Sequence, residues 1–226
     1  MKFIRRRLAG AVLVIAGSLA LASCVTAPEA PAAPSIAMPA PEAAPVAEAA
    51  PARQDLPPLI AEALAALDAH ASRVIHRDKI GVVDFSLPSS EPRFFLVDVA
   101  SGTIERRWLV SHGSGSDPNG TGMVQRFSNQ PGSNATSRGA YLTANTYVGK
   151  YGRSQRLIGL DADNNMAMDR AIVIHGAPYV DPSLIARQGR IGRSQGCFAF
   201  ELGEVGAVMD LLGEGRMIYA GKPAQA

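Results

Sequence analysis

The chain of 226 residues contains little cysteine, and its net positive charge comes from its N-terminal end. Cys24 and Cys197 are its two cysteines, too few for a disulfide-dense scaffold or a zinc ribbon. The net charge is +2, but residues 1–23 hold four basic residues and no acidic one. The remainder carries 18 basic against 20 acidic residues, so it has no basic surplus of the kind that nucleic-acid binding requires.

Motifs for nucleotides and metals are also missing. A glycine-rich stretch at 113–122 lacks the Gly-Lys-Ser or Gly-Lys-Thr ending of a phosphate loop, which argues against nucleotide binding. The sequence has no His-Glu-x-x-His segment and no paired cysteines. We therefore expect no metal and no other cofactor.

The first 23 residues are typical of a signal peptide. A basic start precedes an apolar run from Leu8 to Ala22, which is shorter than the roughly 20 residues of a membrane-spanning helix. The run ends in Leu-Ala-Ser-Cys, which resembles a bacterial lipobox, so we expect Cys24 to be lipidated. The alternative is an ordinary signal peptide with an incidental cysteine. Val25, rather than Asp, then favours the outer membrane, with the protein facing the periplasm.

Residues 24–53 are predicted to be the lipidated N-terminus and a disordered linker. Of the 29 residues from 25 to 53, seven are Pro and 12 are Ala, without hydrophobic periodicity. Residues 54–226 remain as one domain, long enough to bury a core.

Cys197 ends a polar turn that begins at Gly192 and precedes the alternating segment Phe198–Phe200. A buried, inert cysteine is the alternative, but a loop-to-strand junction offers the access and free N–H groups that a thiol nucleophile needs. Among the four histidines, His112 and His175 each follow an apolar strand, whereas His70 and His76 fit a helix surface and its exit. His175 precedes Cys197 by 22 residues, so neighbouring strands can join imidazole and thiol. We expect this pairing to make the thiol more acidic than an ordinary cysteine.

The segments "VIHGAPYV" (173–180) and "GRIGRSQGCFAF" (189–200) resemble the signature of murein L,D-transpeptidases of the YkuD superfamily, YkuD-like 2 branch. "VVDFSLPSSEPRFFLVDV" (82–99), "VSHGSG" (110–115), "FSNQPGSNATSRGAY" (127–141) and "LIGLD" (157–161) extend the likeness over about residues 75–205.

The resemblance implies a compact, mainly β domain with a few helices and the cysteine in a cleft. Turn signals and alternation in the sequence independently favour short strands. We predict helices at 59–74 and 202–212, and strands at Ile80–Phe85, Arg93–Val99, Glu105–Ser111, Tyr141–Thr143, Ala171–Ile174, Cys197–Phe200 and Met217–Ala220.

The resemblance also implies a chemistry. Cys197 would attack a peptidoglycan stem peptide after its third residue, forming a thioester and releasing D-Ala, and an amine from another stem would resolve it. His175 would act as the base, held by a backbone carbonyl, while the N–H groups of Gly196 and Cys197 would bind the oxyanion. Two departures from many relatives are Gln195 in place of a histidine and Ala199 in place of an arginine. Arg193 or Arg170 would then take the place of that arginine.

Other candidates have weaker support. Ser194 is expected either to contact substrate or to cap its own turn. His112, Arg193, Tyr179 and Asn129 are possible substrate-binding residues, each with a structural or solvated alternative. The long loop 112–138 is predicted to cover Cys197, with residues 114–122 shaping an acceptor subsite.

Three functions compete at this point. The first is a transpeptidase, the second is an L,D-carboxypeptidase or wall-amide hydrolase with the same Cys/His site, and the third is a non-catalytic lipoprotein that tethers peptidoglycan. A lone thiol paired with histidine favours the enzymes, since binding alone needs neither group.

Overall fold

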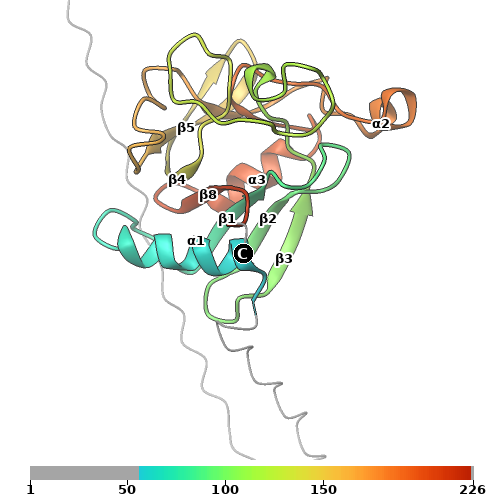
Figure 1. The fold of residues 1–226 in the computed structure, drawn as a ribbon. Coiled ribbons are helices and arrows are strands. Elements are labelled where there is room, and N and C mark those ends of the chain that lie inside the picture. Colours follow the sequence, from blue (N-terminus) through green and yellow to red (C-terminus); the bar gives the residue numbers. More distant parts are fainter. Residues whose placement is uncertain (1–55, 225–226) are drawn as a thin grey trace, which may run out of the picture. The chain divides into compact units, whose positions relative to one another are not determined.

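The computed structural model describes residues 56–224, which form a mixed eight-stranded sheet with three α-helices (Figure 1). The strands are ordered β3-β2-β1-β8-β4-β5-β6-β7 across the sheet. Their bounds are β1 Lys79–Asp84, β2 Phe94–Asp98, β3 Ile104–Trp108, β4 Gly139–Gly149, β5 Gly152–Gly159, β6 Val173–Gly176, β7 Phe198–Phe200 and β8 Met217–Gly221. The helices are α1 Pro58–Ala69, α2 Pro182–Gln188 and α3 Val205–Leu212, with a short 3-10 helix, η2, at Ser114–Ser116. A mainly β domain is confirmed.

Side chains that alternate between the two sides of each strand give the sheet two buried faces. On β1, Val82 belongs to the core that α1 covers, whereas its neighbour Val83 belongs to the core that contains α3. Successive side chains of a strand point to opposite faces, so the two helices pack on opposite sides of the sheet. Parallel pairing occurs between β1 and β8 and between β6 and β7. The second of these pairs carries the site described below.

Helix α1 begins where its sequence predicts but ends early. Pro58 occupies the first turn, where its missing N–H costs nothing. The expected helix ran to Val74, whereas α1 ends at Ala69 and His70 forms its C-cap. Val74 still joins the core beneath α1. The apolar stripe therefore identified a buried residue correctly but assigned it to the wrong element.

Two elements were not predicted. Strand β5 contains the buried polar residues Ser154 and Gln155, which hide the alternation of a strand. Helix α2 has no buried residue, and it relies on Pro182, on the Asp181 side chain as N-cap and on Gly189 in the left-handed region. The expected strand at 171–174 lies at 173–176, and the expected helix at 202–212 begins at Val205.

Several predictions lie outside the described residues: the signal peptide, the lipidation of Cys24 and the Ala/Pro linker. Within residues 56–224, no helix is both long enough and apolar enough to cross a bilayer.

Candidate active site

Cys197 follows a turn that is tied to a distant segment of the chain. Ser194 forms a parallel bridge with Gly113, donating its N–H to His112 O at 2.9 Å and accepting from Ser114 N at 2.8 Å. Its hydroxyl donates to Cys197 O at 2.7 Å and accepts from Gly196 N at 3.1 Å. Of the two alternatives for Ser194, the geometry shows the turn-capping one.

The turn requires glycine at 196. Gly196 has φ +119°, and a Cβ there would meet Ala135 O and Ile172 Cδ1, each at 2.8 Å. Its N–H is already bonded to Ser194, which leaves Cys197 N–H as the remaining donor of the pair expected to bind an oxyanion. The expected role of the Gly196 N–H thus conflicts with its hydrogen bond in this structure.

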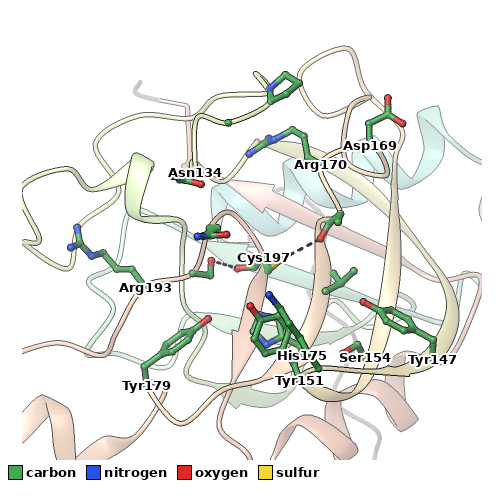
Figure 2. A pocket seen from close by; sticks show the side chains of 17 residues that line it. Asn134, Tyr147, Tyr151, Ser154, Asp169, Arg170, His175, Tyr179, Arg193 and Cys197 are labelled. Carbon is green, nitrogen blue, oxygen red and sulfur yellow. Dashed lines mark hydrogen bonds between the residues drawn. The ribbon is translucent and has the colours of Figure 1, made fainter.

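His175 lies beside this turn on the neighbouring strand. In the parallel pairing of β6 and β7, His175 is opposite Ala199, two residues beyond Cys197. His175 Nδ1 is 2.9 Å from Gly176 O, and because a carbonyl only accepts, Nδ1 carries the proton. Nε2 is therefore left as the unprotonated nitrogen, and Figure 2 shows the imidazole beside the thiol.

The Cys197 thiol rests against backbone. Its Sγ lies 3.5 Å from Ala171 O, which accepts from the S–H group. Ala171 has φ +52°, a left-handed conformation that is uncommon for a residue with a Cβ. Strained backbone therefore presents this carbonyl to the thiol.

Burial sets the protonation of the pair. It raises the pKa of the Cys197 thiol, against the smaller lowering effects of the Val173 N–H, Arg170 and Lys150. Burial also lowers the pKa of His175, which the hydrogen bond to Gly176 only partly offsets. Both shifts favour the neutral thiol and the neutral imidazole. The expectation of an unusually acidic thiol is therefore wrong for this resting arrangement.

Cys197 and His175 line a cavity of about 690 Å³ (Figure 2). It is surrounded by the end of the loop 112–138, the hairpin between β4 and β5, the segment before β6, Tyr179 and the turn 193–195. The residues lining it include Pro131, Gly132, Asn134, Tyr147, Lys150, Tyr151, Asp169, Arg170, Tyr179, Arg193, Ser194 and Gln195. Among the earlier candidates, Tyr179, Arg193 and Ser194 thus join the cysteine and histidine in one cavity. Arg170 also lines it, whereas Ala199 is buried in β7.

His112 does not reach this cavity, because it is fully buried beneath the turn. Arg93 lies 2.6 Å from His112 Nδ1 and can only donate, so Nε2 holds the proton and faces Asp117 at 3.4 Å. Burial is the main cause that lowers the pKa of His112 to about 4. Its position therefore fits the structural alternative. Asn129 lies at a different surface, bonded to Ala162 O and Asn165.

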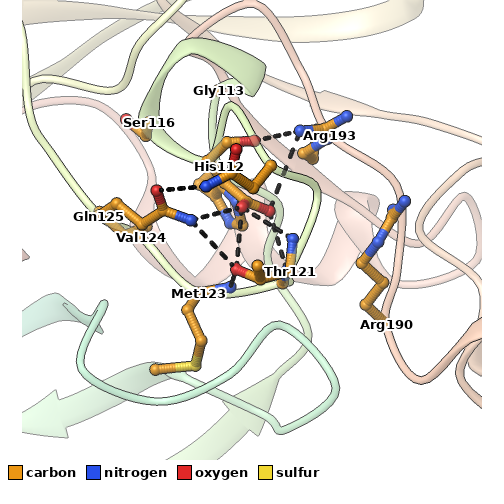
Figure 3. Close-up of polar contacts among 12 residues, drawn as sticks. His112, Gly113, Ser116, Thr121, Met123, Val124, Gln125, Arg190 and Arg193 are labelled. Carbon is orange, nitrogen blue, oxygen red and sulfur yellow. Dashed lines mark hydrogen bonds and ion pairs between the residues drawn. The ribbon is translucent and has the colours of Figure 1, made fainter.

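The loop 112–138 contributes to the cavity through a different part than expected. Its segment 114–122 wraps around the buried Asp117, which accepts from Thr121 N and Gly122 N, each at 2.8 Å. Figure 3 shows the polar contacts around Thr121 in this segment. The cavity is instead lined by Pro131, Gly132 and Asn134. The sequence showed the length of the loop but not which part was anchored.

Sequence reasoning missed the β4–β5 hairpin, which brings Tyr147, Lys150 and Tyr151 to the cavity. The available signal was Gly149-Lys150-Tyr151-Gly152, two residues between glycines, which is typical of a tight hairpin. Within residues 56–224, no cluster of three or more His, Cys, Asp or Glu residues could hold a metal ion.

Comparison with solved structures gives several distant matches. One is an L,D-transpeptidase from Mycobacterium smegmatis, which is 15% identical in sequence and has a TM-score of 0.39. The match covers 64% of this chain and 58% of that chain. Another is residues 123–326 of the L,D-transpeptidase from Xylanimonas cellulosilytica, with 17% identity, a TM-score of 0.38, and coverage of 71% and 69%. L,D-transpeptidase 3 from Mycobacterium tuberculosis has 12% identity, a TM-score of 0.39, and coverage of 64% and 60%.

This chain therefore spans less than two thirds of the two mycobacterial proteins. No curated protein matches it. The family model of the L,D-transpeptidase catalytic domain matches residues 54–220, which is most of the chain. The chain belongs to the L,D-transpeptidase catalytic domain family, in its YkuD-like 2 branch.

Proposed function

We propose that this protein is a peptidoglycan L,D-transpeptidase that uses Cys197 as nucleophile and His175 as base. One observation carries the proposal beyond family membership. The two side chains line the same cavity from neighbouring elements, and the Gly176 carbonyl holds the imidazole with Nε2 unprotonated. A base with a free nitrogen beside a lone thiol is the arrangement that nucleophilic catalysis needs.

In the first half-reaction, the thiol turns from Ala171 O to the imidazole. His175 Nε2 takes its proton as sulfur attacks the carbonyl carbon of the third stem-peptide residue. In this proposal the Cys197 N–H stabilises the oxyanion that develops. The C–N bond then breaks, the imidazolium gives its proton to the departing D-Ala amine, and a thioester remains on Cys197.

The second half-reaction reverses these roles. An amine from another stem attacks the thioester carbon and passes a proton to His175. The C–S bond breaks, and the sulfur takes the proton back. Water in place of the amine would give hydrolysis by the same route, so the acceptor decides between transpeptidase and carboxypeptidase.

Lys150, Arg170 and Arg193 give the cavity three cationic side chains. Stem peptides carry carboxylates, which such charges attract. Arg170 is partly committed, because its guanidinium also donates to Ser128 O at 2.8 Å and to Ala135 O. Arg193 donates to Asp117 O, so Lys150, at the tip of its hairpin, is the freest of the three to approach a substrate.

The test is to incubate the full-length chain with disaccharide tetrapeptide and to read the products by mass spectrometry. We expect crosslinked dimer and free alanine from the wild type, and neither from Cys197→Ser or His175→Ala. Tripeptide without dimer would support the hydrolase function. An unchanged substrate would support the non-catalytic tether. L,D-transpeptidase 3 from Mycobacterium tuberculosis has been solved with a faropenem-derived adduct, so faropenem is a suitable second probe. We expect it to acylate Cys197.

We also propose that a lipid on Cys24 holds the catalytic domain at a membrane of the cell envelope. The support is sequence-based: an apolar run that ends at a lipobox-like site, followed by the Ala/Pro-rich segment 25–53. Such a linker lets a domain reach a polymer some distance from the membrane.

A further inference from the structure

The aromatic ring of Tyr151 lies flat on the imidazole of His175. Their ring centroids are 4.4 Å apart and their planes differ by 20°. Tyr151 comes from the tip of the β4–β5 hairpin, and Figure 2 shows it at His175, beside Cys197. The contact therefore joins a surface turn to the proposed base.

The hairpin is built to present this residue. Gly149 pairs with Gly152, so Lys150 and Tyr151 alone form its tip. Gly152 has φ +75°, and a Cβ there would meet no atom within 4 Å, so its backbone conformation alone calls for glycine. Further along β5, Ser154 pairs directly with His175, which fixes the height of the tip above the imidazole.

The stack covers the imidazole of His175 but leaves the tyrosine ring partly exposed to solvent. Tyr151 remains 46% exposed, whereas His175 is only 2% exposed although it lines an open cavity. The Lys150 ammonium lies 4.7 Å from the centre of the tyrosine ring. An exposed aromatic at a hairpin tip gains little from its own burial, so the contact with His175 is its main packing role.

We propose that Tyr151 is the positioning residue for His175, holding the imidazole flat with Nδ1–H on Gly176 O and Nε2 toward Cys197. The hydrogen bond to Gly176 O holds only the Nδ1 atom, so by itself it does not stop the imidazole ring from tilting. A parallel ring 4.4 Å away opposes that rotation. This inference rests on the proposed function for its importance, but the geometry it asserts can be tested without peptidoglycan.

The experiment uses the full-length chain with ¹⁵N-labelled histidine. The sequence has four histidines, so the His175 signals can be assigned by their loss in His175→Asn. In the wild type, the ring nitrogens should report one tautomer with the proton on Nδ1. In Tyr151→Ala, we expect the two tautomers to mix and the pKa of His175 to rise toward its ordinary value, because water reaches the ring. Tyr151→Phe should match the wild type.

The charged groups around the ring stay constant in this comparison. Lys150 from the hairpin, Asp169 and Arg170 from the segment before β6, Arg193 from the signature turn and the Cys197 thiol all line the same cavity. None of them is substituted, and Lys150, which packs on the tyrosine ring, keeps that contact in Tyr151→Phe. A change in titration that occurs in Tyr151→Ala but not in Tyr151→Phe therefore reports the loss of the ring.

The second measurement is the rate at which faropenem acylates Cys197. Tyr151→Ala should lower it about tenfold, the equivalent of one aromatic contact, and Tyr151→Phe should restore it. Tyr151→Leu keeps an apolar side chain without a flat face, so its acylation rate should be intermediate. This variant replaces Tyr151→Ala if the alanine variant folds poorly. Val148→Ala is the matched control, because Val148 is 83% exposed on the same hairpin and does not line the cavity.

Unchanged ring signals and acylation in Tyr151→Ala would overturn the proposal. A phenylalanine variant as impaired as the alanine variant would also overturn it, because the hydroxyl rather than the ring would then matter. Failure of the proposed function looks different: the tautomer would still respond to Tyr151, but the wild type would not process a stem peptide.

Discussion

The hydroxyl of Ser194 donates to the carbonyl oxygen of Cys197 at 2.7 Å, which closes the turn that carries the thiol. The hydroxyl oxygen of Ser194 also accepts from the N–H of Gly196 at 3.1 Å. One side chain thus fixes the peptide group before Gly196 and the peptide group after Cys197, and Gly196 between them has φ +119°, a conformation that suits glycine. The position of the thiol depends on this turn as much as on Cys197 itself.

Gly196→Ala should therefore damage the site severely. The new methyl group would approach Ala135 O and Ile172 Cδ1 at 2.8 Å in a backbone with φ +119°. We expect the free energy of unfolding to fall by about 1–3 kcal/mol and acylation of Cys197 by faropenem to fall at least about 100-fold. Gly206→Ala on α3 is the matched control, since its methyl meets no atom within 4 Å. Near-normal acylation in Gly196→Ala would mean that the turn adapts.

The reactivity of Cys197 should increase with pH without a plateau in the acid range. Burial raises the pKa of this thiol and lowers that of His175, so the ion pair is disfavoured at neutral pH. In a Cys24→Ser background, alkylation by iodoacetamide should be slower at pH 7 than that of an unstructured cysteine peptide. It should continue to rise beyond pH 9, the ordinary thiol value. A fast plateau at low pH that disappears in His175→Ala would instead reveal a preformed thiolate–imidazolium pair.

His112 should make the fold sensitive to acid. Its pKa falls from 6.5 to about 4 on folding, so the unfolded chain binds the proton more readily. Its contribution to stability is therefore lost as the pH falls through this interval, by about 3 kcal/mol in total. The free energy of unfolding of His112→Asn should decline less than that of the wild type between pH 7 and pH 4. The exposed His76→Asn is the control, and parallel curves for His112→Asn and wild type would contradict the prediction.

Local pattern was enough to predict most of the strands and to allow two neighbouring ones to bring the thiol and the imidazole together. Apolar runs marked the strands, and a polar turn before Phe198 separated Cys197 from an ordinary core cysteine. The parallel pairing of β6 with β7 then supplies the proximity that the 22-residue spacing only allowed.

Partners distant in sequence could not be predicted in the same way. His112 follows an apolar strand as His175 does, but Arg93 and Asp117 hold it in the core. Tyr151 belongs to a hairpin whose second strand was hidden by buried polar residues. Both assignments depend on which strands become neighbours, and no local periodicity records that.

Cys24→Ala should abolish membrane anchoring, because the sequence places this cysteine at the end of the apolar run. We expect unprocessed precursor or release of the domain, measured by fractionation and by the mass of the N-terminal peptide. Ser23→Ala keeps a small residue before the cysteine and should be processed normally. If Cys24→Ala still partitions into membranes as a mature lipid-modified chain, the anchor lies elsewhere.

The part of the loop that faces the cavity should decide between transfer and hydrolysis. Ser133 N donates to Gln130 O at 3.2 Å, and Gly132 has φ +76°, so Pro131 and Gly132 form a tight turn over the site. Proline stiffens that turn, and a stiff cover favours a bound amine over water.

Pro131→Gly should therefore raise tripeptide relative to crosslinked dimer at least about twofold, in line with the fraction of a kcal/mol that a stiffer turn contributes. Acylation by faropenem should change less, because Cys197 and His175 are untouched. Pro118→Gly is a matched control: Pro118 occupies the equivalent position of the turn closed by Gly120 N and Asp117 O, but it is exposed and outside the cavity. Equal product ratios in wild type and Pro131→Gly would show that this turn does not select the acceptor.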